Sequence, residues 1–322
     1  MSVNNKMTHR ERAIAALECR VPDMIPHYEL AYHISQLSHG KKMLAHGGDV
    51  KRFINAGYSD AEMEYKLEEY ANVMAEVFTD LEWSIIPIPG TNERVAAGLS
   101  KYLHKILGDS VLLCMNGDGT FAIPGGDKMY DFVYRIADDP DEVHEEAKTK
   151  MQKAIERNKR MHDAGIECFQ LCSDYCYNSG PFLSPAMFSE FITPYLAQLI
   201  DEIRKMGGYA IKHTDGNIMP ILDQLMDCRP HAIHSIDPMA GVDIAKVKKL
   251  TYEKGIAICG NVDCSKIQTG TDDEIRESAL YAIECGKPDG GYIYCSSNCV
   301  FSGVTFEKYK VYHDVWKQHR EY

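Results

Sequence analysis

Residues that could bind a metal follow a series of short apolar runs in the second half of the sequence. Three of them, Asp237, Cys259 and Cys299, are separated by 22 and 40 residues. Aspartate, histidine and cysteine are the side chains that zinc sites use in proteins. The long separations match no zinc finger, whose ligands lie close together in pairs, but they fit one ligand for each repeated strand and helix of a barrel. The complete series of polar residues at the ends of these runs is Asp174, His213, Asp215, Asp237, Cys259, Cys295 and Cys299.

Each of these residues also has a purely structural interpretation. A buried cysteine such as Cys259 is commonly a small hydrophobic core residue. Asp237 precedes a proline and could cap the following turn. His213 could be a core histidine or a donor to a substrate, whereas Cys299 follows a Ser-Ser-Asn run and is no obvious core residue. The spacing alone therefore leaves the ligand set open.

The elements that position these residues alternate regularly. Five apolar runs, separated by helical patterns, are typical of parallel strands joined by crossover helices. One long helical pattern is expected to begin after an N-cap at Ser184, with Pro185 as its first residue, and to end at Gly207 and Gly208. The polar ends of the runs would then meet at the carboxyl face of a barrel, where such barrels carry their active sites. A doubly wound open sheet is the alternative fold, but the sequence has no glycine-rich phosphate loop after an early strand. The five runs are 167–174, 209–216, 232–238, 256–263 and 292–298.

The first half supplies the remaining strands. The segments 24–29, 81–89 and 111–119 have strand-like apolar patterns, and a hairpin excursion is expected around 111–143. We therefore predict an α/β fold, a (β/α)₈ TIM barrel. It forms a single domain over residues 1–322 with an N-terminal helical extension.

Composition restricts the class of protein. The chain has 11 cysteines, a net charge of −12 and no basic cluster, so nucleic acid is not an expected partner. No apolar stretch is long enough to cross a membrane, and the first residues lack a signal-peptide core. The odd number of cysteines and their scattered positions favour free or metal-binding thiols in a reducing compartment. A cytoplasmic protein is the expectation.

Six motifs follow one another along the chain: MTHRERAIAALECRVPDMIPHYE, CSDYCYNSGPFLSPAMFSEFITPY, HTDGNIMPILDQLMD, HSIDPMAGVDIAKVKKL, ICGNVDCSKIQTGTDDEIRE and GGYIYCSSNC. They resemble the uroporphyrinogen decarboxylase superfamily, in its zinc- and corrinoid-dependent methyltransferase branch. They extend over nearly the whole chain in the order that the superfamily has. The decarboxylases themselves carry an arginine-rich segment near the N-terminus, whereas residues 29–42 contain no arginine. Because arginine pairs with carboxylates in a bidentate way, decarboxylation of a porphyrinogen with many carboxylates is not expected.

The resemblance also implies a metal and its ligands. One group of the branch transfers methyl from methylcobalamin to a thiol and binds zinc with a His-x-Cys pair and a distant cysteine. Here His213 is followed by Asp215 in place of that cysteine. A second group, the O-demethylases, has a site resembling one acidic residue and two distant cysteines. This implies Asp237, Cys259 and Cys299 as zinc ligands, with His213 as the alternative ligand.

The implied activity is transfer of a methyl group from a methyl ether, such as a methoxylated aromatic, to the cobalt(I) of a corrinoid protein. Zinc would stabilise the negative charge that develops on the leaving oxygen. His213 and Tyr175 are expected as proton donors, and Asp174, Asn178 and Asp215 as substrate contacts. The partners would be the corrinoid protein and a small methyl donor, and a homodimer is allowed. Transfer from methylcobalamin to a thiol, or a decarboxylase-like enzyme without metal, are the alternatives.

Overall fold

The computed structural model describes residues 6–44 and 47–322, and its centre is a curled parallel sheet. Seven strands are hydrogen-bonded in the order β1-β2-β3-β6-β7-β8-β9, and every neighbouring pair is parallel. A separate antiparallel hairpin, β4–β5, follows β3. The strands are β1 (Ile85–Ile88), β2 (Leu112–Asn116), β3 (Cys168–Cys172), β4 (Cys176–Tyr177), β5 (Gly180–Pro181), β6 (Tyr209–His213), β7 (Ala232–His234), β8 (Ala257–Cys259) and β9 (Tyr292–Ile293).

The segment 24–29 closes the sheet into a barrel. The N–H of Tyr294, just after β9, donates to Pro26 O, and the N–H of Tyr28 donates back to Tyr294 O. On the other side, Ser84 N–H, just before β1, donates to His27 O. The segment therefore lies between β1 and β9, the two outer strands of the sheet, and takes the place of an eighth strand. Because Pro26 has no N–H to donate, the pairing is an isolated bridge and not a continuous ladder.

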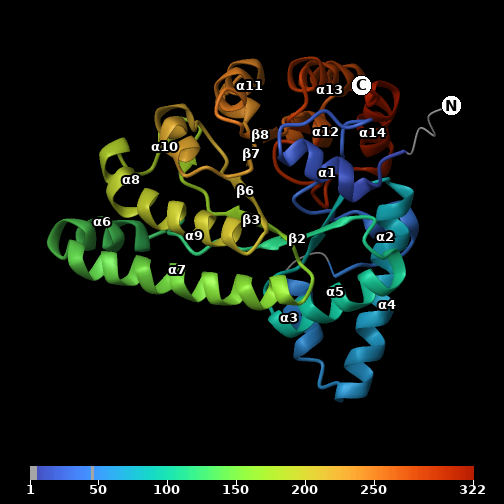
Figure 1. Cartoon of the computed structure of the whole chain (residues 1–322), viewed down its shortest axis with the longest axis horizontal. Helices are drawn as coiled ribbons and strands as arrows, with labels where there is room; N and C mark the ends of the chain where they lie inside the picture. Colours follow the sequence, from blue (N-terminus) through green and yellow to red (C-terminus); the bar gives the residue numbers. More distant parts are fainter. Residues whose placement is uncertain (1–5, 45–46) are drawn as a thin grey trace.

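Helices surround the strands, as Figure 1 shows, and return the chain from one parallel strand to the next. The predicted (β/α)₈ TIM barrel is therefore confirmed. No helix in the described part of the chain combines the length and apolar character needed to cross a lipid bilayer. The α-helices are α1 (His9–Leu17), α2 (Ser35–His39), α3 (Gly47–Ile54), α4 (Asp60–Asp80), α5 (Glu93–Leu107), α6 (Lys128–Asp138), α7 (Pro140–Asp163), α8 (Pro185–Phe191), α9 (Thr193–Lys205), α10 (Leu222–Asp227), α11 (Ile244–Tyr252), α12 (Cys264–Thr269), α13 (Asp272–Gly286) and α14 (Phe306–His319); short 3₁₀ turns are η1 (Met219–Ile221) and η2 (Pro238–Ala240).

Apolar residues fill the barrel interior, and α1 packs against them. Ala13, Ala16 and Leu17 of α1 are buried in one cluster with inward-facing residues of the strands. This helix contacts β1, β2 and β9. Thr8 caps it with a capping box, in which its hydroxyl accepts from Glu11 N–H.

The expected hairpin around 111–143 is wrong in its second part. Residues 112–116 form β2, but Lys128–Asp138 is helix α6 and α7 begins at Pro140. Phe132 and Ile136, four residues apart, are the buried residues of α6, which is helical and not strand spacing. Asp139 then accepts a hydrogen bond from Glu142 N–H and starts the next helix.

The predicted long helix after Ser184 also differs from the structure in one respect. Its start is confirmed, because the Ser184 hydroxyl accepts from Met187 N–H and Pro185 is the first helical residue. The helix is interrupted at Ile192, where α8 ends and α9 begins with Pro194 in its first turn. A proline lacks the N–H that a continuous helix needs, so the break falls there.

Candidate metal centre

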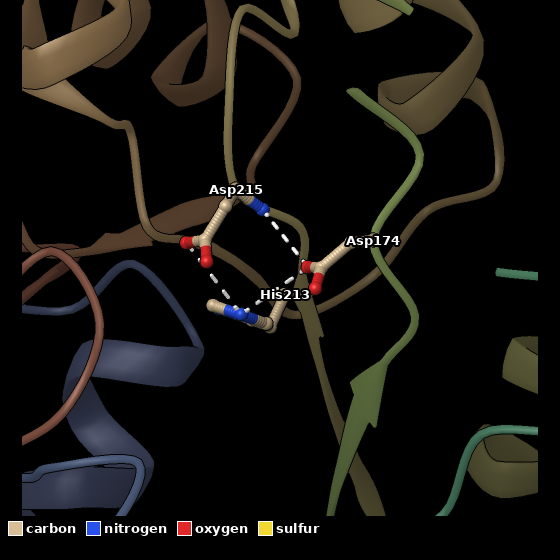
Figure 2. Close-up of side chains that lie close together, drawn as sticks. All are labelled: Asp174, His213 and Asp215. Atoms are coloured by element: carbon tan, nitrogen blue, oxygen red, sulfur yellow. Dashed lines mark hydrogen bonds and ion pairs between the residues drawn. The ribbon is translucent and has the colours of Figure 1, made fainter. Parts of the chain in front are cut away.

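Three potential metal ligands lie together at the carboxyl ends of β3 and β6. Asp174 follows β3, His213 is the last residue of β6, and Asp215 comes two residues later. One ligand atom from each lies within 4.8 Å of those from the other two. The His213 Nε2 atom is 3.6 Å from Asp174 Oδ1 and 3.7 Å from Asp215 Oδ1. Figure 2 shows the two carboxylates and the imidazole turned toward one another.

The backbone after β6 places Asp215 and holds it in register with Asp174. The N–H of Asp215 donates to Asp174 Oδ1 over 3.2 Å. Gly216 then turns the chain with a φ of +81°, and a Cβ at this position would lie 2.6 Å from Cys176 O. Only glycine fits such a close approach in that backbone region. The Gly216 N–H donates to Asp237 Oδ2, which ties the turn to the chain after β7.

The Asp215 carboxylate is fixed by two further side chains. Ser235 Oγ is 2.8 Å from Asp215 Oδ1, and Asn298 Nδ2 donates to Asp215 Oδ2 over 2.5 Å. Ser235 has a φ of +86°, and the next residue, Ile236, has a φ of +50°. Non-glycine residues persist in this left-handed region only where surrounding contacts determine them, and they cluster at functional sites. The turn after β7 is thus built to bring Ser235 onto the carboxylate.

The loop that carries Asn298 is anchored by a buried glutamate. Glu29 is fully buried at the end of segment 24–29. It accepts a hydrogen bond from Ser296 N–H over 3.0 Å and another from the Ser296 hydroxyl over 2.6 Å. The hydroxyl of Tyr312 also donates to Glu29. Burial raises the pKa of Glu29 to about 7, although these hydrogen bonds act in the opposite direction. The hydrogen bonds to Ser296 restrain the backbone two residues before Asn298.

A second histidine supports His213 from the barrel interior. His213 and His234 are opposite each other in the β6–β7 register, and their Nδ1 atoms are 2.6 Å apart. One of these nitrogens must donate and the other accept. When Nε2 of His213 faces a cation, its Nδ1 carries the proton and His234 Nδ1 accepts it. His234 then keeps its own proton on Nε2, for which no described residue provides a partner.

Burial and like charges disfavour the ionised form of Asp215. Desolvation raises the pKa of Asp215 to about 6, and the nearby charges of Asp174 and Asp237 add to this. Desolvation also lowers the pKa of His213 to about 4, so the imidazole is neutral at physiological pH. A neutral imidazole and ionised carboxylates are the protonation states that metal binding needs. A divalent cation would relieve the repulsion that raises the pKa of Asp215.

A buried ion pair involves Lys212, the residue directly before His213 in β6. Lys212 and Asp118 are almost completely buried, with Nζ 3.0 Å from Oδ2. Burial acts to raise the pKa of Asp118, but the Lys212 ammonium and hydrogen bonds from Thr120 hold the pKa below its usual value. Lys212 Nζ also donates to Leu171 O and Ser173 O, which joins the ends of β6 and β3.

The residues predicted as zinc ligands from the resemblance are not gathered in this way. Within residues 6–44 and 47–322, Asp174, His213 and Asp215 are the one set of three His, Cys, Asp or Glu residues whose ligand atoms all lie within 4.8 Å of one another. Asp237 instead caps η2, with Oδ1 accepting from Met239 N–H, and accepts from Gly216 N–H through Oδ2. Asp237 therefore caps the following turn, as its structural interpretation from the sequence predicted.

The two predicted cysteine ligands occupy different environments. Cys259 is fully buried in the interior cluster with Ile293 and Cys295, whereas Cys299 is 8% exposed in the loop after β9. Burial raises the pKa of both thiols well above the usual value, which favours the uncharged form. The core interpretation of Cys259 therefore matches its surroundings.

The remaining predicted site residues separate into two groups. Asp174 and Asp215, expected as substrate contacts, belong to the metal-ligand group. Tyr175 is buried, and its hydroxyl lies 2.6 Å from Thr120 Oγ1 while Lys212 Nζ lies 4.0 Å from its ring centroid. Asn178 is exposed in the turn between β4 and β5. The contacts of Tyr175 and Asn178 thus lie outside the group of three.

Sequence reasoning missed three residues that hold the group in place: His234, Ser235 and Asn298. His234 could have been found, because it ends its apolar run as His213 does and parallel register brings such ends side by side. Ser235 and Asn298 had no comparable signal. Their contacts with Asp215 depend on the loop conformations after β7 and β9.

The donor set suits a divalent ion such as Zn²⁺. Zinc binds histidine nitrogen and carboxylate oxygen, and catalytic sites have three protein ligands with one position open. Two carboxylates and a neutral imidazole would leave the ion formally neutral, whereas the predicted Asp-Cys-Cys set would leave it at −1. Ligands with outer partners such as His234, Ser235 and Asn298 are also typical of metal sites.

Comparison with known proteins identifies the family. A model described as uroporphyrinogen decarboxylase (URO-D) matches residues 120–319, which is more than half of the chain. The chain belongs to the uroporphyrinogen decarboxylase family. This URO-D match contains the whole candidate metal centre. A comparison with curated proteins gave no match.

Among solved structures, a methyltransferase from Methanosarcina mazei shares the fold. It has a TM-score of 0.73 and 15% sequence identity, with 97% of this chain and 99% of that chain covered. A putative vitamin-B12 independent methionine synthase from Listeria monocytogenes matches at a TM-score of 0.47 and 13% identity, covering 84% and 90% of the two chains. At 15% identity the first match establishes the barrel fold alone. The second match, with a TM-score below 0.5, supports no conclusion about this chain.

Proposed function

We propose that this URO-D family protein is a metal-dependent methyltransferase that moves a methyl group from a methyl ether to the cobalt(I) of a corrinoid protein. The observation that carries the proposal is the Asp174, His213 and Asp215 group at the carboxyl end of the barrel. The Methanosarcina mazei structure that shares the fold is itself a methyltransferase, which adds support. The proposed metal is Zn²⁺.

The chemistry explains why such an enzyme would need a metal. An alkoxide or phenoxide is a poor leaving group, so the developing negative charge on the ether oxygen must be stabilised. A bound divalent ion supplies Lewis-acid stabilisation of several kcal/mol. A formally neutral site with oxygen and nitrogen ligands is a stronger acid than the thiolate-rich site implied by the resemblance.

The protein residues have roles that follow from their contacts. His213 is proposed as a ligand and not as a proton donor, because its pKa of about 4 leaves it neutral. Asp215 is held by Ser235 and Asn298, so its oxygens keep one orientation. The Asp174 side chain is 50% exposed, which leaves one side of the group open to solvent and to an approaching partner. Substrate and corrinoid would approach from that side.

The direct test is single-turnover methyl transfer. Protein loaded with Zn²⁺ is mixed with a methoxylated aromatic and a cobalt(I) corrinoid, and formation of methylcobalt is followed by absorbance. We expect transfer that requires zinc and falls at least about 100-fold in His213→Ala. His231→Ala, which removes a half-buried histidine before β7, is the matched control and should retain activity. Transfer that proceeds equally without metal would reject the proposal.

One observation favours a second candidate, a decarboxylase-like enzyme without metal. A carboxyl group with a pKa of about 6 is well suited to proton transfer near neutral pH. In that case Asp215 would act as the general acid. Turnover that is insensitive to chelators and follows the protonation of Asp215 would support this candidate over the methyltransferase.

A further inference from the structure

A cavity of about 170 Å³ lies at the carboxyl ends of β1, β2 and β3. Its wall includes three methionines, Met43, Met74 and Met115, together with Phe78. We propose that this cavity binds an uncharged, single-ring group of the methyl donor. The inference rests on the proposed methyl transfer for the identity of that donor, but ring binding can be measured without it.

The cavity size limits the group that can enter. An apolar cavity of about 150 Å³ in another protein binds benzene, so a space of 170 Å³ accommodates one six-membered ring with a small substituent. A tetrapyrrole has four rings and could not enter as a whole. The cavity therefore selects a compact donor or a compact part of one.

The wall chemistry selects a neutral aromatic ring. Methionine sulfur makes favourable contacts with aromatic rings, and its flexible side chain adapts to different shapes. No lysine, arginine, aspartate or glutamate is among the described residues of the wall. An ionised substituent placed there would lose its hydration without gaining an opposite charge, which is unfavourable.

One polar group on the wall points to a hydrogen-bond acceptor on the ligand. Gln170 is 4% exposed, and its Oε1 accepts from the Tyr28 hydroxyl over 2.5 Å. Its Nε2 has no hydrogen-bond partner among the residues that the structure describes. Because an unpaired buried N–H is unfavourable, an ether or phenol oxygen on the ring would be stabilised beside it.

The cavity adjoins the metal-ligand group through one strand. Cys172, at the end of β3, lines the cavity and is opposite His213 in the β3–β6 register. Asp174 follows two residues later. A ring in the cavity would therefore lie next to the group that is proposed to stabilise its leaving oxygen.

Binding of two probes tests the inference without corrinoid. Calorimetry on the zinc-loaded protein compares 2-methoxyphenol, which is neutral, with 4-hydroxy-3-methoxybenzoate, which is an anion. We expect the neutral probe to bind at least tenfold more tightly. Equal affinities, a preference for the anion, or no binding of the neutral probe would overturn the inference.

Two variants locate the binding. Met74→Phe reduces the cavity and should weaken binding of 2-methoxyphenol at least fivefold, while Met63→Phe, on the same helix α4 and also buried but outside the cavity, should not. Gln170→Leu removes the unpaired donor and should weaken binding severalfold. Unchanged zinc affinity in each variant verifies that the barrel mouth is folded. Unchanged probe binding in both cavity variants would overturn the inference.

The outcome separates this inference from the proposed function. If 2-methoxyphenol binds as expected but no methyl transfer occurs, the cavity assignment stands and the methyltransferase proposal fails. If methyl transfer occurs and KM is the same in wild type, Met74→Phe and Gln170→Leu, the methyltransferase proposal stands and the cavity assignment fails.

Discussion

The two sides of the barrel mouth have opposite chemistry. At the ends of β6 and β7 lie His213, Asp215 and Ser235; the Ser235 hydroxyl donates to Asp215 Oδ1, and His213 Nε2 lies 3.7 Å from the same oxygen. Over β1 and β2 the neighbouring space is bordered by methionines such as Met74 and Met115. Strand β3 lies between the two sides. The contrast indicates that one side could hold a cation and stabilise charge, whereas the other could bind an apolar group. A site that activates an apolar substrate requires both.

The largest effect is expected from the buried charge that supports the polar side. Lys212→Met leaves Asp118 buried without its partner, which should lower the free energy of unfolding by about 3–5 kcal/mol. Urea unfolding measures this loss. The double variant Lys212→Met/Asp118→Asn should recover part of it, because the unpaired charge is gone. A loss below about 1 kcal/mol in the single variant would show that the pair is not buried as the structure has it.

A smaller effect is expected from the histidine behind the metal-ligand group. His234→Ala removes the partner of His213 Nδ1 and should weaken zinc binding roughly 10- to 100-fold, as loss of an outer-shell partner does. Competition with a chromophoric chelator measures the affinity. Met115→Leu, on the apolar side, is the control and should leave zinc affinity within about twofold. Equal effects of the two variants would remove the distinction between the sides.

The pH dependence of zinc binding gives a graded test of the polar side. The pKa of Asp215 is raised to about 6, so protons and zinc compete for its carboxylate below that pH. Zinc affinity should fall about tenfold for each pH unit below 6 and level off above it. His213, with a pKa of about 4, adds a second proton only at lower pH. In Asp215→Asn the inflection near pH 6 should disappear, and its persistence would assign it to another group.

The barrel could be predicted because its signal is local and repeated. Each apolar run after residue 167 forms a strand, and Ser184 with Pro185 starts a helix as expected. The error around residues 129–143 arose where aromatic and β-branched residues suggest strands although Phe132 and Ile136 have helical spacing.

The candidate site was predictable only in part. Strand ends identified His213, Asp174 and Asp215 as neighbours, since parallel register brings them to one face. Which strand-end residues come within ligand distance depends on the turns that follow. The positive φ of Ser235 and the close approach at Gly216 decide that, and no pattern of residue types reveals it.

The most direct test of the central claim is zinc stoichiometry and affinity in two competing variants. Metal analysis and chelator competition are carried out on wild type, His213→Ala and the double variant Cys259→Ala/Cys299→Ala. We predict one zinc per chain in wild type and in the cysteine variant, and at least about 100-fold weaker binding in His213→Ala. Loss of zinc in the cysteine variant, together with retention of zinc in His213→Ala, would contradict the account. That result would instead indicate Asp237, Cys259 and Cys299 as the zinc ligands.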